Sequence, residues 1–354
     1  MNKKRAFSLS LVLVLACSLF GACSGSSSSP SSSSAPAVPD FPAQSASSAA
    51  PTADAFPTQP VKIIVQYAAG GGVDVTARLL AKYAEKHLGQ NIVVENRTGG
   101  SGVLGLTALA GSDPDGYTLG LVFPNTAVEH MIMEGVSYTI DSFEPIVQVN
   151  FDPAFLVAKK GGPCDVPLAD LLATTKQDQL NMGIGALWQG FDFVKLLLAQ
   201  QEGAKFTRIA FDGGAGVTKA LAAGDIDVGM QFPNEWVSYY NTNEMVGIAV
   251  ASEERLTAFP DVPTFKELGI DIGDMGVRRV LVAPKGIDPS RLHVLEEAFL
   301  KAMQDPDLIK EFNELGMSVI PENAQVANEL LHSDADLLID IITIADVKPG
   351  DPPN

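Results

Sequence analysis

Along most of the chain, short apolar runs alternate with stretches in which apolar residues recur every three or four positions. The short runs predict strands at 61–65, 92–94, 117–123, 145–149, 154–158, 206–210, 226–231, 246–250 and 277–283. Helical spacing is clearest at 75–88, where Val75, Leu79, Leu80 and Tyr83 share one face. Prolines near 167 and 289 mark helix starts, and the chain is expected to be helical from about 289 to 344. This alternation is typical of an α/β fold.

The first 22 residues have the pattern of an export signal. Lys3, Lys4 and Arg5 form a basic start, an apolar run covers 6–20, and small residues precede Cys23. About 15 apolar residues are too few to span a bilayer comfortably, so residues 1–22 are predicted to be a secretory signal peptide. An uncleaved anchor helix is the alternative. Either way, the mature protein lies outside the membrane.

Cys23 lies at the predicted cleavage site and is followed by a polar, serine-rich stretch. This arrangement resembles a bacterial lipobox, in which the cysteine thiol is diacylated, and it predicts a lipid anchor at Cys23. Phe20 stands where that pattern prefers leucine, and Cys17 is the competing site. The predicted location is extracytoplasmic and membrane-anchored, in the periplasm or on the outer face of the cytoplasmic membrane.

Residues 23–57 are predicted to comprise the lipidated cysteine and a disordered spacer, because residues 24–57 are nearly all Ser, Ala and Pro. The remaining roughly 295 residues are enough for two lobes rather than one core. We expect residues 58–153 and 283–354 to form one lobe and residues 154–282 to form the other. The strands at 154–158 and 277–283 would cross between the lobes and make a hinge.

The chain is strongly acidic, with a formal charge of −18 that becomes −21 once the three cations of residues 1–22 are removed. Such a surface argues against nucleic acid and anionic lipid as partners. It also repels anionic ligands, so a bound anion must be held by local dipoles that outweigh the overall field.

The segment after the strand at 61–65 carries the clearest chemical signal. Gly70, Gly71 and Gly72 join this strand to the helix at 75–88. Glycines let backbone amides approach a ligand, and Asp74 is placed to cap the helix N-terminus. Free amides and the positive end of the helix dipole then make an anion site. The GxGxxG and Walker patterns are absent, and a simple strand-to-helix turn is the alternative.

Three more glycine clusters lie at 98–102, 181–186 and 211–216. The clusters at 98–102 and 211–216 lie between a predicted strand and a helix, and the cluster at 181–186 leads into a helix from about Gly190. Four such turns exceed what connecting strands to helices requires. Ligands of open α/β sheets bind beyond the carboxyl ends of the strands, where these turns lie. In a two-lobed protein, loops from both lobes could close around one small molecule by hinge motion.

No catalytic constellation is apparent in the sequence. His87, His130, His293 and His332 are scattered, and GxSxG, HExxH and CxxC motifs are absent. Cys164 is expected to be a buried structural residue, and no metal or cofactor is expected. We therefore expect a binding protein rather than an enzyme, with an exported hydrolase or transferase as a remaining alternative.

Five aromatic residues flank the third glycine cluster or follow the strand at 226–231. They are Trp188, Phe191, Phe193, Phe232 and Trp236. Packing in the core is the default expectation for these side chains, and lining of a ligand cleft is the alternative.

Several segments together resemble the substrate-binding component of tripartite tricarboxylate transporters, the Bug family. They are VKIIVQYAAGGGVDVTARLLAKYAEKHLGQNIVVENRTGGSGVLG, DPDGYTLGLV, FDGGAGVTKALAAGDIDVGM, RLTAFPDVPTFKELG and VLVAPKGIDPSRLHVLEEAF, within residues 57–340. The resemblance implies a two-lobed, type II-like periplasmic-binding-protein fold with two crossing strands. It also implies a carboxylate ligand between the lobes, held largely by backbone amides and ordered waters, and its delivery to a two-component integral membrane permease.

The ligand-binding residues predicted from the resemblance and the loops fall in four places. They are Tyr67, Ala69, Gly71, Gly72, Val73 and Asp74 in the first loop, Gly183, Gly185, Ala186 and Trp188 at the third, Asp212, Gly213, Gly214 and Ala215 at the fourth, and Gln231 after a strand.

The sequence departs from the family pattern where side-chain donors are usual. Ala69 and Val73 replace a proline and a hydroxyl residue of the first loop, Asp192 lies near a usual histidine, and Gln231 replaces an acidic residue. Each lost donor is worth roughly 0.5–1.5 kcal/mol. We therefore expect a smaller or partly apolar mono- or dicarboxylate rather than a citrate-like ligand. The protein is expected to act as a monomer, and a binding protein that feeds a sensor kinase is the alternative.

Overall fold

The computed structural model describes residues 56–133, 135–185, 188, 190–211 and 213–348. The predicted signal peptide, Cys17, Cys23 and most of the spacer lie outside these residues, as do the predicted site residues Ala186 and Asp212. Within the described part of the chain, no helix is both long and apolar enough to cross a membrane.

The first five-stranded sheet is built from β1 (Val61–Val65), β2 (Ile92–Asn96), β3 (Thr118–Val122), β4 (Phe143–Pro153) and β10 (Gly276–Pro284), in the order β2-β1-β3-β10-β4. The three strands β1, β2 and β3 are parallel, whereas β10 runs antiparallel between β3 and β4. Its helical elements are α1 (Gly72–Leu88), α2 (Val103–Ala110), α3 (Thr126–Ile132), α8 (Pro289–Met303), α9 (Pro306–Glu314), α10 (Ala324–Ile344) and the short turns η1 (Gly100–Gly102) and η2 (Ile140–Ser142). We call this sheet with its helices lobe 1.

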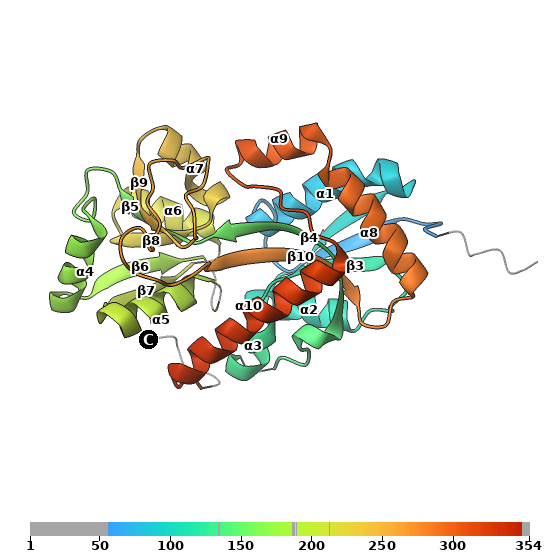
Figure 1. The fold of residues 1–354 in the computed structure, drawn as a ribbon, viewed down its shortest axis with the longest axis horizontal. Helices are drawn as coiled ribbons and strands as arrows, with labels where there is room; N and C mark the ends of the chain where they lie inside the picture. The colour runs from blue at the N-terminus through green and yellow to red at the C-terminus, as the bar shows by residue number, and fades with distance from the viewer. Residues whose placement is uncertain (1–55, 134, 186–187, 189, 212, 349–354) are drawn as a thin grey trace, which may run out of the picture. The chain divides into compact units, whose positions relative to one another are not determined.

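The second five-stranded sheet is built from β5 (Phe155–Lys159), β6 (Leu180–Ile184), β7 (Phe206–Ala210), β8 (Val228–Gln231) and β9 (Met245–Val250), in the order β7-β6-β8-β5-β9. Strands β6, β7 and β8 are parallel, and β5 pairs antiparallel with both β8 and β9. Its helices are α4 (Leu168–Gln177), α5 (Gly190–Glu202), α6 (Gly214–Ala223) and α7 (Pro233–Asn241). We call this sheet with its helices lobe 2 (Figure 1).

The apolar pattern places the helices on the sheets. Ala77, Leu80 and Ala84 of α1 recur every three or four residues and are fully buried in the same hydrophobic core as Ile63 of β1. Burying a leucine side chain of this kind stabilises the fold by about 1.5–3 kcal/mol relative to its exposure. The predicted strands are found within a few residues of their expected limits.

The predicted helical stretch from 289 to 344 is three helices rather than one. Asp305 caps α9 by accepting the amide hydrogen of Asp307 at 3.0 Å, and Pro306 begins that helix. Gly316 has a φ of +74°, which ends the α9 turn, and Asn323 caps α10. These capping signals override the continuous apolar spacing, because a proline and a left-handed residue both interrupt helical hydrogen bonding.

The chain passes between the lobes at Ala154, between β4 and β5, and again before Gly276 at the start of β10. Ala154 donates its amide hydrogen to Met275 O at 2.8 Å and accepts from Ala251 N at 2.9 Å, so the crossing segments are tied by their backbones. Figure 1 shows β4 and β10 of the lobe 1 sheet running side by side toward lobe 2. The two passages adjoin the first residues of β5, which lies in the lobe 2 sheet, and of β10, which lies in the lobe 1 sheet.

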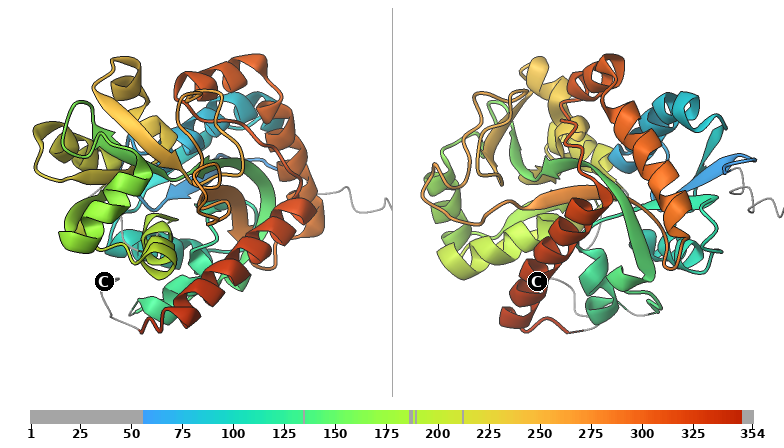
Figure 2. Two further views of the ribbon diagram at one scale, coloured as in Figure 1. Left: turned by 60° about the vertical axis from the view of Figure 1, so that its left-hand side comes forward. Right: turned by 45° about the vertical axis from the view of Figure 1, so that its right-hand side comes forward.

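Helix α10 packs against both lobes. It contacts β4 and α3 of lobe 1 and also α5 of lobe 2. In Figure 2 this C-terminal helix runs across one face of the molecule, beside α3.

Candidate ligand-binding site

A cavity of about 690 Å³ lies where the two lobes face each other. It is bounded by the loops that follow β1, β2 and β3 in lobe 1 and β6, β7 and β8 in lobe 2, together with β10. Parallel strands bring their carboxyl ends to one edge of a sheet, which is where α/β proteins bind ligands. The polar, charged and aromatic residues that line the cavity include Gln66, Tyr67, Phe123, Phe211, Phe232, Asn234, Glu235 and Arg279.

The first glycine loop presents the N-terminus of α1 to this cavity. Gly70 has a φ of +84°, which favours glycine, and Gly71 is the N-cap of the helix in an extended conformation. The first helical hydrogen bond runs from Val75 N to Gly71 O, so the amides of Gly72 and Val73 have no acceptor within the helix. These amides and the helix dipole provide the predicted anion-binding geometry.

Asp74 does not cap α1, contrary to the sequence prediction. It lies within the first helical turn, is nearly fully buried, and accepts hydrogen bonds of 2.9 Å each from Gly70 N, Arg78 Nε and Asn96 Nδ2. Burial alone would raise the pKa of Asp74, but the hydrogen bonds from Arg78, Gly70 and Asn96 together hold it below its ordinary value. Asp74 therefore fixes the shape of the loop from behind.

Arg279 on β10 is the main candidate site residue that the sequence-based prediction did not include. Its side chain is 1% exposed, and Nη1 forms an ion pair with the buried carboxylate of Asp152 on β4. Nε has no hydrogen-bond partner among the described residues, and Nη2 lies 2.8 Å from the position that a Cβ on Gly72 would take. A buried guanidinium thus adjoins the N-terminus of α1 and has donor capacity to spare.

A signal for Arg279 was present in the sequence. Arg278 and Arg279 interrupt the apolar strand of Val277 and Val280, and a cation on the buried side of a strand must have a partner. Arg278 takes the opposite face and pairs with Asp334 of α10 at 2.6 Å. Which of the two arginines pointed inward could not be read from the sequence.

Glu235 is the second missed residue. It occupies the first turn of α7, and its carboxylate Oε2 accepts the amide hydrogen of Phe232 at 2.8 Å. Burial raises the pKa of Glu235 to about 7, against the opposing effects of the Phe232 amide and the Arg279 charge. A glutamate three residues after a helix N-cap commonly reaches back in this way, so the Pro-Asn-Glu order was a usable signal.

The aromatic residues divide between the cavity and the core. Phe123, Phe211 and Phe232 line the cavity, and Tyr67 stacks on Phe123 with ring centroids 6.2 Å apart. Trp188, Phe191, Phe193 and Trp236 are buried in the hydrophobic cores. The expected core role thus holds for all five aromatic residues, and Phe232 also borders the cavity.

The structure brings most of the predicted site residues together. Those that line the cavity are Tyr67, Ala69, Gly71, Gly72, Val73, Gly185, Gly213, Gly214 and Ala215. Four others, Asp74, Gly183, Trp188 and Gln231, are buried outside the lining. The second glycine cluster, residues 98–102, also lines the cavity, although no residue of it was in the predicted set.

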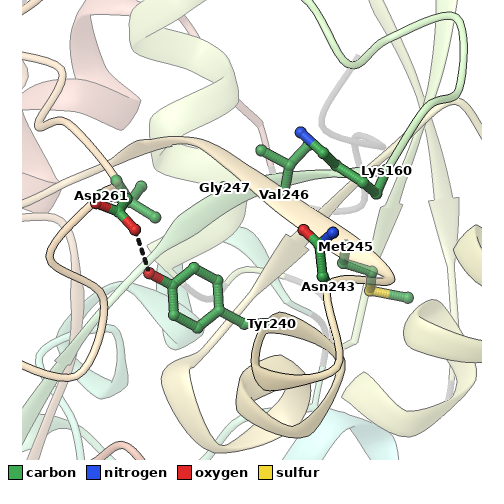
Figure 3. A pocket seen from close by; sticks show the side chains of 8 residues that line it. Lys160, Tyr240, Asn243, Met245, Val246, Gly247 and Asp261 are labelled. Atoms are coloured by element: carbon green, nitrogen blue, oxygen red, sulfur yellow. Dashed lines mark hydrogen bonds between the residues drawn. The ribbon is translucent and has the colours of Figure 1, made fainter.

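A second hollow, of about 170 Å³, lies beside β9 and α7 of lobe 2 (Figure 3). Tyr240 donates a 3.4 Å hydrogen bond to Asp261 there, and Lys160 also lines this hollow. This hollow is small and is not formed by the loops at the carboxyl ends of the parallel strands. Within the described ranges, no group of three His, Cys, Asp or Glu side chains could hold a metal ion.

Two α/β lobes that enclose a cavity at their strand ends define a two-lobed solute-binding protein. Residues 76–345 match the family described as the tripartite tricarboxylate transporter family receptor, TctC, and the chain belongs to this family. The predicted family and the two-lobed fold are thereby confirmed. The family consists of solute receptors, so the protein is a receptor and not an enzyme.

Curated relatives support this assignment over most of the chain. A UPF0065 protein from the TAR-I ttuE-ttuC' intergenic region of Agrobacterium vitis is 32% identical over 266 residues, covering 74% of this chain and 77% of the relative. Protein BugT of Bordetella pertussis is 29% identical over 273 residues, covering 76% of this chain and 83% of the relative.

Solved structures agree with the fold. A TctC solute-binding protein from Polaromonas, without ligand, is 30% identical with a TM-score of 0.66 and covers 81% of this chain and 99% of its own. MatC from Rhodopseudomonas palustris, with bound malate, is 26% identical with a TM-score of 0.74 and covers 81% of this chain and 100% of its own.

Proposed function

We propose that the protein is an extracytoplasmic receptor that captures a small organic mono- or dicarboxylate in the cavity between its lobes and delivers it to a two-component membrane permease. The observation that carries this proposal is the meeting of the α1 N-terminus with the buried guanidinium of Arg279 at Gly72. Amide donors and a guanidinium are the groups that hold carboxylates in proteins.

The local charge explains how an acidic protein can hold an anion. The ion pair with Asp152 offsets the charge of Arg279, but the unpartnered Nε and the Nη2 group next to Gly72 retain N–H groups that can donate to a ligand carboxylate. Charge-assisted hydrogen bonds in a water-poor site are stronger than those at the surface. They can therefore oppose a distant negative surface field, which salt screens within about 8–10 Å.

The relatives support the ligand class and the partner. MatC, at 26% identity, is a structure with bound malate, a small carboxylate. The family description supplies the tripartite transporter as the partner. A hinge motion between the lobes would bend the backbone where the chain crosses, at the segments of Ala154 and Met275.

A thermal-shift and calorimetric screen tests the ligand class. The panel contains acetate, benzoate, lactate, malate, succinate, adipate and citrate, with sugars and neutral amides as controls. We expect at least one mono- or dicarboxylate to bind, adding about 2.7 kcal/mol to stability at a hundred times its dissociation constant. Binding of citrate alone, or of sugars in preference to acids, would overturn the proposal.

The lipid anchor at Cys23 is part of the same proposal. Metabolic labelling with a radioactive fatty acid should mark the wild-type protein and should fail for Cys23→Ala, whereas Cys17→Ala should label normally. Label that depends on Cys17 instead would move the anchor to the competing site. A membrane-bound protein without any label would favour the uncleaved helix.

A further inference from the structure

Two helix N-termini face the cavity from opposite lobes in similar local settings. In lobe 1, Gly71 and Gly72 begin α1 after β1, and in lobe 2, Gly213 and Gly214 begin α6 after β7. Gly213 has a φ of +88°, a conformation that favours glycine. Both ends could hold an anion by their free amides.

The lobe 2 position is already filled by the protein's own carboxylate. A Cβ on Gly214 would overlap the carboxylate of Glu235, which therefore lies directly on the first residue of α6. The α7 amide of Phe232 donates to Oε2 of this carboxylate at 2.8 Å. With the Gln231 amide turned so that its nitrogen faces Glu235, that nitrogen lies 2.9 Å from Oε2, and the Gln231 oxygen accepts from Thr218 N at 3.2 Å. The carboxylate is thus held in place from several sides.

The two ends of the cavity consequently differ in charge. The lobe 1 end has the amides of Gly72 and Val73 and the guanidinium of Arg279, whereas the lobe 2 end has the acceptor oxygens of Glu235. A second ligand carboxylate at the lobe 2 end would meet a like charge and find its amide donors occupied. A hydroxyl, amide or ammonium group there would instead find an acceptor.

We propose that Glu235 is a specificity-determining residue that takes the place of a second ligand carboxylate, so that the receptor selects monocarboxylates carrying a hydrogen-bond donor at their far end. This inference rests on the proposed function and narrows its ligand class. Burial raises the pKa of Glu235 to about 7, so its carboxylate carries the charge that repels a second ligand carboxylate above that pH, and the titrations are made at pH 8.

Matched ligand pairs test this selectivity. Purified full-length protein is titrated calorimetrically with succinate, glutarate and adipate and with the monoamide of each, in which one carboxylate becomes a carboxamide of nearly the same shape. The wild-type protein should bind the preferred monoamide at least about tenfold more tightly than its diacid. In Glu235→Gln, which keeps the shape and removes the charge, the ratio should shift toward the diacid by at least about tenfold.

Glu254→Gln is the matched control, because Glu254 is an exposed glutamate outside the cavity lining, and it should keep the wild-type ratio. If Glu235→Gln fails to fold, the ratio of monoamide to diacid affinity in the wild-type protein still tests the inference. Diacids that bind the wild type as tightly as their monoamides, or a ratio that Glu235→Gln leaves unchanged, would overturn the role of Glu235. Absence of binding by all six acids, and by the wider carboxylate panel, would overturn the proposed function and this inference with it.

Discussion

The guanidinium of Arg279 lies directly against Gly72, with Nη2 2.8 Å from the position that a Cβ on Gly72 would occupy. The two residues come from different parts of lobe 1, Gly72 from the start of α1 and Arg279 from the middle of β10. Because glycine has no side chain, a buried cation can stand beside amides that have no acceptor within their helix. This contact is the centre of the proposed carboxylate site.

Gly72→Ala should weaken carboxylate binding by about 10- to 100-fold, because the added methyl group would displace either Arg279 Nη2 or Asn234 Oδ1. Isothermal titration with the best ligand of the screen measures the loss. Gly71→Ala is the matched comparison, since its Cβ would meet only Ala68 O at 3.4 Å, and a smaller loss is expected. If Gly72→Ala and the wild type bound the carboxylate with equal affinity, Arg279 would not be part of the binding site.

Arg279→Met should destabilise the fold by about 3–5 kcal/mol, because it leaves the Asp152 carboxylate buried without its cation. Urea unfolding followed by circular dichroism gives the free energy. The double variant Arg279→Met with Asp152→Leu should recover most of that loss, since replacing both partners of a buried ion pair by apolar residues is often neutral. A double variant no more stable than the single one would contradict this account.

Stability should fall as the pH rises from about 5 to 7. Burial raises the pKa of Glu129 to about 7, although the hydroxyl of Tyr138 donates to it at 2.6 Å. Its folded pKa exceeds its unfolded value, so the folded state binds more protons between the two values, and the stabilisation present at low pH is lost on passing through pH 7. Burial likewise raises the pKa of Asp192 to about 6 and the pKa of Glu235 to about 7. Both shifts therefore lower the stability in the same direction as the pH rises.

Glu129→Gln isolates one of these contributions. Urea midpoints measured from pH 5 to pH 8 should show a slope shallower by up to about 1.4 kcal/mol per pH unit, because one proton no longer distinguishes the folded and unfolded states. Glu254→Gln on the surface should keep the wild-type slope. An unchanged slope in Glu129→Gln would mean that Glu129 titrates normally.

Gly276→Ala should destabilise the junction between the lobes by about 1–3 kcal/mol, because its Cβ would overlap the backbone oxygen of Asp152. The same measurement on Gly111→Ala is the control. A Cβ at Gly111 would meet only Thr107 O at 3.4 Å, so a change within about 0.5 kcal/mol is expected. If Gly276→Ala were as stable as the control, the crossing segments would not be closely packed.

Much of the architecture could be predicted from local patterns. Every strand of the described residues except β6 was visible as a short apolar run, and β6 was missed because Asn181 and Gly183 interrupt its apolar residues. The first glycine loop was recognisable as a helix N-terminus because its glycines lie between a buried strand and a stretch of helical spacing. The helices at the end of the chain were less well predicted, since apolar spacing continues across the caps at Asp305 and Asn323. Asp74 was read as a cap because its type fits that role, but Gly71 occupies the position.

The sequence by itself determined the alternation of strands and helices, the glycine turns that expose amides, and the resemblance that identifies the family. The tertiary structure decided which side chains face the cavity. Arg279 and Asp152 are 127 residues apart, and Glu235 meets Gly214 only because α7 folds back over the start of α6. Such pairings depend on how the chain crosses between the lobes and on how the helices pack, which local residue spacing does not encode. The exposed amides of the first loop were therefore predictable, whereas the buried arginine beside them and the glutamate of α7 were not.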